Sequence, residues 1–214
     1  MPDPNQSPGF SRRSFIKTVG VSATVTTLAG LAEAHAAARE KEESDALQGP
    51  GPVAMAFTIN GKAAEALAEP STTLAEVLRY SLGLTGTKII CDRGSCGGCS
   101  VIVNGKLLNA CMTLAIDVQG ATITTVEGIA SGGNLDPVQE SFLRHDALQC
   151  GYCTPGFIVA TRVLLNDVPK PTLEHIKKAL GGNICRCGTY TNIFNAALEA
   201  SGQAPIMDQN GVRA

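Results

Sequence analysis

The region that follows the first quarter of the chain alternates between apolar and polar residues, the pattern of half-buried β-strands. A strand is predicted over 53–60, and Asn60-Gly61 is a dipeptide typical of the tight turn of a β-hairpin. A return strand over 62–67 completes this hairpin, and a second hairpin is predicted over 100–109 around Asn104-Gly105. These patterns predict a small sheet built from hairpins.

One helix is predicted between the two hairpins. The run Thr73-Leu74-Ala75-Glu76 has the pattern of a capping box, and the helix should end near Gly83. A final strand, rich in Thr, Ile and Val, is predicted over 121–127. Strands that pack on a single helix predict a small α+β unit over 53–128, with a Gly- and Cys-rich loop over 91–100.

The pattern changes to helical spacing after a connector at 131–134. In the first predicted helix, Val138, Phe142 and Leu143 fall on one face, and Asp136-Pro137 supplies an N-cap followed by proline at the first helical position. Three more helices are predicted, from Thr154-Pro155, over 172–181, and from Thr191 or Asn192 to about residue 200. The region 137–200 is therefore predicted to be an all-helical domain.

The N-terminus, residues 1–36, has the three parts of a twin-arginine export signal. Arg12-Arg13 lies in the run SRRSFIK, a moderately apolar stretch spans 18–31, and Ala34-His35-Ala36 offers a cleavage site. Charged and Gly-Pro-rich residues over 37–52 predict a flexible linker. Residues 201–214 are predicted to form a loose tail.

This signal also predicts a location. The twin-arginine route moves proteins that are already folded, often with cofactors inserted, so it favours a metal cofactor and a periplasmic destination. An uncleaved membrane anchor is the alternative, but the apolar stretch is short and Glu33 ends it. No other segment reaches the ~18 apolar residues that a spanning helix needs. No stable membrane insertion is therefore expected.

Composition excludes two further classes of protein. Hydrophobic residues make up 44% of the chain, enough for a packed core, which excludes wholesale disorder. The 17 Lys and Arg residues are outnumbered by 19 Asp and Glu, and aromatic residues make up only 4%. A nucleic-acid binder would show a basic excess, so no nucleic-acid partner is expected.

The eight cysteines are the unusual feature of the composition, and they fall into two groups of four. The first group, with C-x4-C-x2-C spacing and a fourth cysteine after eleven more residues, is Cys91, Cys96, Cys99 and Cys111. This spacing is typical of plant-type ferredoxins that bind a [2Fe–2S] cluster. Gly94, Gly97 and Gly98 permit a tight loop that directs backbone N–H groups at the sulfurs. The second predicted hairpin can return Cys111 to the same site.

The second group combines a C-x2-C pair with a C-x-C pair and consists of Cys150, Cys153, Cys185 and Cys187. The pairs are separated by 31 residues and adjoin different predicted helices. Helix N-termini after Cys153 and after Cys187 would face the sulfurs, where the helix dipole favours a negatively charged cluster. Arg186 adds a positive charge between two ligands and is expected to raise the reduction potential.

Disulfides and zinc are two other uses for these cysteines. Four disulfides are disfavoured because the chain is large enough to build its own core, and Cys185 and Cys187 lie too close to pair with one another. A zinc site with four cysteine ligands suits the second group taken alone, but the first group lacks the two short pairs usual in zinc fingers. His145 and His175 have no spaced partners and are expected to be structural or solvated.

The motifs CDRGSCGGCS…AC, QCGYCTPGF and GNICRCGTY resemble the iron–sulfur subunit of the xanthine oxidase family of molybdenum hydroxylases. The likeness covers about 53–200 and fills all eight ligand positions. With its twin-arginine signal, the chain is most similar to the iron–sulfur subunits of bacterial periplasmic aldehyde oxidoreductases. The resemblance implies an α+β chain, with a β-grasp ferredoxin-like domain followed by a four-helix domain, each holding one [2Fe–2S] cluster.

The resemblance also implies partners. A large subunit would carry molybdopterin and oxidise an aldehyde to a carboxylic acid, and a third subunit or domain would carry FAD. Electrons would pass from molybdenum to the helical-domain cluster, then to the ferredoxin-domain cluster and then to FAD. Gln149 and Cys187 match the residues that approach the pterin in the family.

The chain itself would then be an electron-transfer subunit that is not catalytic on its own. Related subunits serve hydroxylases that act on N-heterocycles or purines, which is one alternative. A freestanding carrier with two clusters is another.

Overall fold

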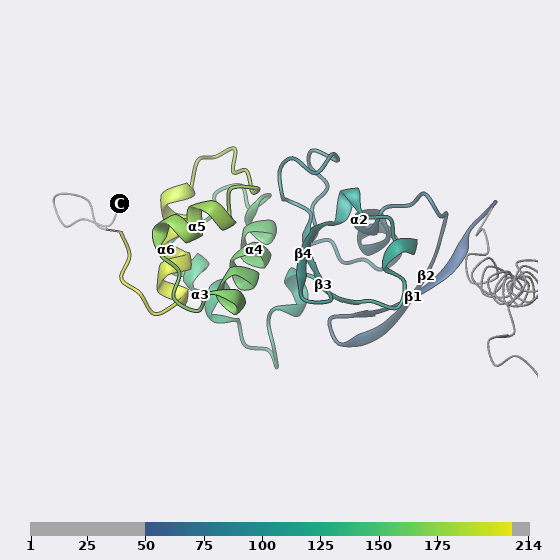
Figure 1. Cartoon of the computed structure of the whole chain (residues 1–214), viewed down its shortest axis with the longest axis horizontal. Helices are drawn as coiled ribbons and strands as arrows, with labels where there is room; N and C mark the ends of the chain where they lie inside the picture. The colour runs from purple at the N-terminus through teal and green to yellow at the C-terminus, as the bar shows by residue number, and fades with distance from the viewer. Residues whose placement is uncertain (1–49, 207–214) are drawn as a thin grey trace, which may run out of the picture. The chain divides into compact units, whose positions relative to one another are not determined.

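The structure is a computed structural model that describes residues 50–206, all within one compact unit. The predicted export signal over 1–36, nearly all of the predicted linker over 37–52 and the end of the predicted tail lie outside the described residues. Along the chain a sheet comes first and a group of four helices follows (Figure 1). The predicted α+β fold is confirmed.

Five strands form one mixed sheet in the order β2-β1-β5-β3-β4. The strands are β1 (Val53–Ile59), β2 (Lys62–Ala68), β3 (Ser100–Val103), β4 (Lys106–Asn109) and β5 (Thr122–Thr124). Parallel pairing of β1 with β5 joins the two antiparallel hairpins β1-β2 and β3-β4. Both hairpins turn through an Asn-Gly pair with positive φ, 51° and 76° at Asn60 and Gly61 and 48° and 80° at Asn104 and Gly105. Turns of type I′ need this conformation, which explains why the sequence predicts both hairpins correctly.

The last strand is shorter than the sequence predicts. After Thr124 the chain leaves the sheet and forms a 3-10 turn over Val126–Gly128, where a strand to residue 127 was expected. The side chain of Asn60 causes the change, because its Oδ1 accepts from the Thr125 backbone N–H at 2.9 Å and its Nδ2 donates to Thr125 Oγ1 at 3.0 Å. The Asn60 side chain, from the turn of the first hairpin, thus accepts the hydrogen bond of the Thr125 N–H in place of a backbone carbonyl of a neighbouring strand.

The helix on the sheet begins where its capping box predicts. Thr73 caps α2 (Leu74–Glu76), its Oγ1 accepts from the Glu76 N–H, and the Glu76 carboxylate accepts from the Thr73 N–H. The helix then continues as a π-helical segment over Val77–Ser81. Leu74 and Leu78 are fully buried within the core of the sheet domain.

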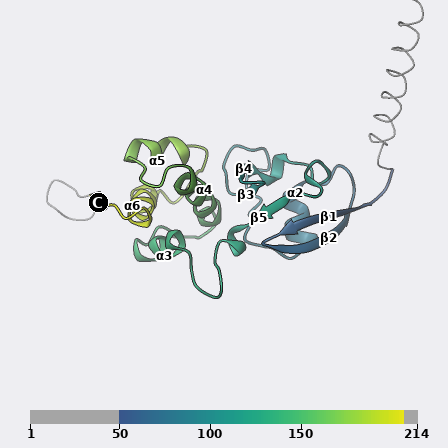
Figure 2. The same ribbon diagram turned by 60° about the horizontal axis from the view of Figure 1, so that its bottom comes forward.

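Four helices form the second half: α3 (Pro137–Arg144), α4 (Thr154–Asp167), α5 (Leu173–Ala179) and α6 (Tyr190–Ala200). They lie together in both views and enclose a separate hydrophobic core (Figures 1 and 2). Asp136 and Thr172 cap α3 and α5 as part of capping boxes. The capping side chains therefore locate two of the four helix starts directly from sequence.

Two details of the predicted helices are wrong. Helix α6 has Thr189 as its N-cap and begins at Tyr190, earlier than the predicted start after Thr191 or Asn192. The Tyr190 ring packs edge-on against Phe157, with the ring centroids 6.2 Å apart, and this packing holds Tyr190 in the first turn. On α3, Leu143 is 57% exposed although it was expected on the buried face.

The start of the predicted tail is also ordered by contacts. Gln203 Nε2 donates to the Pro171 carbonyl at 2.8 Å, and the Ile206 N–H donates to Asn195 Oδ1 at 2.6 Å. Ile206 is partly buried against the core of the helices. Residues 201–206 are therefore packed on the helical half, in contrast to the loose tail that the sequence predicts.

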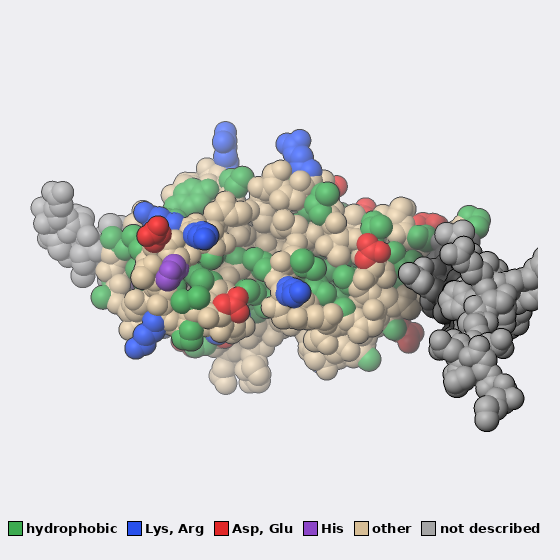
Figure 3. All heavy atoms as spheres, viewed as in Figure 1, with side chains coloured by type: hydrophobic (Ala, Val, Ile, Leu, Met, Phe, Trp, Pro, Cys, Tyr) green, Lys and Arg blue, Asp and Glu red, His purple; other side chains and the backbone are tan. Residues whose placement is uncertain are grey.

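Charged side chains are scattered over the described surface on the face shown in Figure 3, among apolar and uncharged groups.

None of the described helices has both the length and the apolar character needed to span a membrane.

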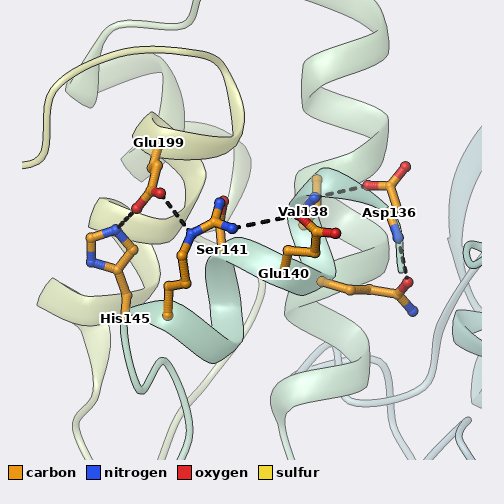
Figure 4. Close-up of polar contacts among 8 residues, drawn as sticks. Asp136, Val138, Glu140, Ser141, His145 and Glu199 are labelled. Carbon is orange, nitrogen blue, oxygen red and sulfur yellow. Dashed lines mark hydrogen bonds and ion pairs between the residues drawn. The ribbon is translucent and has the colours of Figure 1, made fainter. Parts of the chain in front are cut away.

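One ionic network ties the last helix to the end of α3 (Figure 4). Glu199 on α6 accepts from Arg144 Nε at 2.7 Å and is paired with His145 Nε2. The His145 side chain is only 4% exposed, in agreement with a structural role for this histidine. Burial raises the pKa of Glu199, but hydrogen bonds from His145 and Arg144 outweigh it, so the pKa lies below its ordinary value.

Glu199→Gln is expected to lower the unfolding midpoint of the full chain by about 3–6 °C at pH 7. The change removes the anionic partner of a buried side chain, which costs about 1–2 kcal/mol. A carboxyl whose pKa is lowered by folding adds stability above its ordinary pKa, and this stability is lost as the pH falls through the lowered value. The gap between variant and wild type should therefore narrow once the pH falls below the ordinary carboxyl pKa of about 4.3, and close below the lowered value.

Calorimetry of the full chain across this pH range measures the effect. Glu140→Gln is the matched control, because the ion pair of Glu140 with Arg144 is about half exposed on both sides and should contribute little. Equal midpoints for Glu199→Gln and wild type at pH 7 would contradict the account of this network.

Candidate metal centres

The first group of cysteines is assembled by the second hairpin. Cys99 directly precedes β3 and Cys111 follows β4, and the β3-β4 ladder pairs Ser100 with Asn109. This register brings both cysteines to the same end of the hairpin, where the Cys111 N–H donates to Cys99 Sγ at 3.5 Å. Both cysteines are buried. A separation of twelve positions in sequence is thus closed by sheet pairing.

The loop between Cys91 and Cys99 directs backbone groups at the sulfurs. The Gly94 N–H donates to Cys111 Sγ at 3.4 Å. Gly94 has a φ of +70°, and a Cβ at this position would lie 2.9 Å from Cγ of Met112. Only glycine combines this backbone conformation with this close approach, as the sequence predicts for the loop.

The thiols of this group differ in pKa. Loss of hydration opposes ionisation of Cys91, but hydrogen bonds from the Arg93 backbone and from the Cys96 side chain outweigh it and lower its pKa to about 7. Burial raises the pKa of Cys99 to about 12, and the neighbouring Cys111 and Cys96 thiols add to the rise. The four thiols are therefore close enough to interact, with contacts within the pairs Cys91–Cys96 and Cys99–Cys111.

The second group lies where two helices begin. Cys153 immediately precedes α4 and is buried, and its side chain contacts that of Cys185, which is also buried. Cys150 and Cys187 are exposed. Burial together with Cys185 raises the pKa of Cys153 to about 12. The four thiols thus combine two buried ligand candidates with two at the surface.

Polar groups from the start of α6 surround Cys185. The Cys185 N–H donates to Tyr190 Oη at 2.9 Å, and its Sγ lies 3.2 Å from Thr189 Oγ1. Burial raises the pKa of Cys185, but hydrogen bonds from the Thr189 side chain and backbone outweigh it, and the pKa falls to about 7. These contacts favour the thiolate, which is the form that ligates iron.

The two cysteine groups touch through the backbone. The Ile184 N–H donates to the Cys96 carbonyl at 3.0 Å, and Asn183 Nδ2 donates to the Gly97 carbonyl at 3.0 Å. On the other side, Gly156 of α4 lies so close that a Cβ there would be 2.2 Å from Gly97 O. A single hydrogen bond therefore links the Cys96 peptide to the residue before Cys185.

The donor set fits two thiolate-ligated clusters. All eight cysteines are free thiols. The thiols contact one another in pairs, Cys91 with Cys96, Cys99 with Cys111 and Cys153 with Cys185. A [2Fe–2S] core has two irons that share four protein thiolates, whereas zinc holds four ligands at about 2.3 Å from one centre. The four free thiols of each group match in number the four thiolates that a two-iron core needs.

The remaining predicted site residues are at the surface or have other partners. Gln149 is exposed, as is Cys187, and their predicted approach to a pterin stays a prediction. His175 Nδ1 accepts from the Thr172 N–H in the cap of α5. Sequence reasoning missed Asn183 and Thr189, because their partners could not be deduced from spacing, although both lie within the run GNICRCGTY.

Comparison with known proteins agrees with this geometry. Residues 57–119 match the family model described as a 2Fe-2S iron-sulfur cluster binding domain, and residues 125–198 match the [2Fe-2S] binding domain. The aldehyde oxidoreductase iron-sulfur-binding subunit PaoA of Escherichia coli K12 is 44% identical over 171 residues, which span 72% of this chain and 75% of that protein.

Two other relatives extend the comparison. A probable xanthine dehydrogenase subunit from Bacillus subtilis is 46% identical over 141 residues, or 66% of this chain and 81% of that protein. A crystal structure of quinoline 2-oxidoreductase from Pseudomonas putida 86 superposes with a TM-score of 0.68 at 39% identity and covers 73% of this chain and 100% of that one. The chain therefore belongs to the iron–sulfur subunits of the xanthine oxidase family of molybdenum hydroxylases, as its cysteine motifs predict.

Proposed function

We propose that the chain is the electron-transfer subunit of a molybdenum-containing aldehyde oxidoreductase and is not catalytic on its own. In this role it passes electrons from a molybdopterin centre in a large subunit through two [2Fe–2S] clusters to FAD in a further subunit. The observation that carries the proposal is the backbone hydrogen bond at 3.0 Å from the N–H of Ile184, the residue before Cys185, to the Cys96 carbonyl, which places the two cysteine groups next to each other. A chain that only stored two metals would not need such a contact.

Each quartet of cysteines would hold one cluster, and when bound each cluster supplies a site that takes up and releases one electron. The ligands are Cys91, Cys96, Cys99 and Cys111 in the sheet domain and Cys150, Cys153, Cys185 and Cys187 in the helical domain. Burial of four of these cysteines keeps water from their sulfurs, and the backbone N–H groups of Gly94 and Cys111 donate to the sulfurs of Cys111 and Cys99. The exposed Cys150 and Cys187 provide a surface at which a partner can approach.

Exposed residues beside the helical-domain cluster support the proposed direction of electron transfer. Gln149 and Cys187 would approach the pterin of the large subunit, which makes the helical-domain cluster the first acceptor. The sheet-domain cluster would follow and would deliver electrons to the FAD subunit. The relative from Escherichia coli supports an aldehyde as substrate of the complex, while the relatives named for xanthine and quinoline favour a purine or N-heterocycle as the second candidate.

Isolation of the tagged full chain from its native host tests this role. We expect a large molybdopterin subunit and an FAD subunit to co-purify, and an aldehyde to reduce the clusters in the complex without any added reductant. Reduction by a purine or N-heterocycle, with none by aldehydes, would select the second candidate. A monomeric chain that carries both clusters would instead indicate a freestanding electron carrier.

We also propose that the chain is exported to the periplasm through its twin-arginine signal, with the partners carried along. The sequence around Arg12-Arg13 supports this, since the route transports folded proteins with their cofactors. Arg12→Lys together with Arg13→Lys should leave the complex in the cytoplasmic fraction. Partner subunits that still reach the periplasm in this variant would contradict transport as one complex.

A further inference from the structure

Thr189 is placed next to a cluster ligand in an unusual way for a helix N-cap. An N-cap threonine ordinarily accepts a hydrogen bond from a backbone N–H in the first turn of its helix. Thr189 makes no such bond, although it is the N-cap of α6. Its Oγ1 lies 3.2 Å from Cys185 Sγ, and the residue is only 7% exposed. The hydroxyl is therefore directed at sulfur and shielded from water.

Iron ligation would fix the direction of this hydrogen bond. Between a thiol and a hydroxyl either atom can donate, but a cysteine bound to iron is a thiolate without a proton. Only Thr189 Oγ1–H can then donate, with Cys185 Sγ as acceptor. Hydrogen bonds from charged or ionic partners are stronger than neutral ones, and burial strengthens them further.

From this contact we propose that Thr189 is a positioning residue that raises the reduction potential of the helical-domain cluster. The inference rests on the proposed function, because it needs a cluster on Cys185. Reduction adds one electron to the cluster from an external donor, no bond forms or breaks, and the hydroxyl proton stays on Thr189. The added negative charge is shared by the ligand sulfurs, so a donor to Cys185 stabilises the reduced form more than the oxidised form.

Thr189→Val removes the donor and keeps the shape of the side chain. We expect the reduction equilibrium of one cluster to shift about tenfold toward the oxidised form, which for a one-electron couple is about 59 mV. The shift is measured by redox titration with dithionite, followed by electron paramagnetic resonance, on the full chain isolated with its partner subunits. The second reduction step, from the sheet-domain cluster, should not move.

Two variants serve as controls. Thr189→Ser keeps the hydroxyl and should keep the wild-type potential. Thr161→Val makes the same isosteric change at a fully buried threonine of α4, eight residues beyond Cys153 and so about 12 Å further along the helix. It should leave both potentials unchanged.

The outcomes separate this inference from the proposed function. A lower potential in Thr189→Val, with Thr189→Ser at the wild-type value, supports the tuning role. An unchanged potential in Thr189→Val, or an equal shift in Thr189→Ser, would overturn it, because the hydroxyl would then have no effect on the potential. Loss of the cluster from Thr189→Val alone would also overturn it, because the hydroxyl would then be needed to bind the cluster. If wild type itself binds no iron, the proposed function has failed.

Discussion

Cys185→Ser is expected to reduce the iron bound by the chain from about four atoms to about two, because it removes a buried ligand of the helical-domain cluster. Its thiol contacts the Cys153 thiol and the Thr189 hydroxyl, and its backbone N–H donates to Tyr190 Oη. The sheet-domain cluster does not depend on Cys185 and should persist. In the proposed complex, reduction of the FAD subunit by the substrate should fall to background, since the proposed first acceptor is missing.

Iron analysis and electron paramagnetic resonance of the isolated complex measure this loss, and turnover measures the uncoupling. Ile184→Ser is a matched control, because it introduces serine at the adjacent, half-exposed position and leaves the sulfur and the backbone contact to Cys96 in place. It should retain about four irons. Full iron content and full turnover in Cys185→Ser would exclude Cys185 as a ligand.

Gly156→Ala should separate the two halves of the chain. A Cβ on Gly156 would lie 2.2 Å from the Gly97 carbonyl oxygen and 3.1 Å from the Gly98 Cα, and both are backbone atoms with no rotamer to change. The first turn of α4 must therefore move away from the cysteine loop. Overpacking of this kind costs about 1–3 kcal/mol or more. The move would also break the hydrogen bonds from Asn183 and Ile184 to the loop.

Thermal unfolding of the full chain measures the stability, and magnetic coupling between the two reduced clusters measures their separation. The unfolding midpoint and the strength of the magnetic coupling should both fall in Gly156→Ala. Gly182→Ala is the control, since a Cβ there meets no atom within 4 Å. Wild-type stability and coupling in Gly156→Ala would show that the close contact between Gly156 and Gly97 does not hold the halves together.

Local chemistry explains which parts of this fold could be predicted from the sequence. Asn-Gly turns and the capping side chains Thr73, Asp136 and Thr172 act within a few residues, and each one starts or ends an element where expected. The cysteine motifs could be recognised for a similar reason, because the spacing within C-x4-C-x2-C, C-x2-C and C-x-C is short.

Long-range contacts explain the rest. The early end of β5 depends on Asn60, which is 65 residues away from Thr125. The start of α6 depends on packing of Tyr190 against Phe157. The junction of the two cysteine groups depends on Asn183 and Gly97, separated by 86 positions. Nothing in the local sequence of either partner encodes these contacts.

The central claim is that the eight thiols bind iron as two separate quartets. Quantification of iron, zinc and acid-labile sulfide in the full chain, isolated from a host that matures iron–sulfur proteins, tests it directly. The account predicts about four irons and about four sulfides per chain and no stoichiometric zinc. A colourless preparation free of iron, with the thiols bound to zinc or oxidised to disulfides, would contradict it.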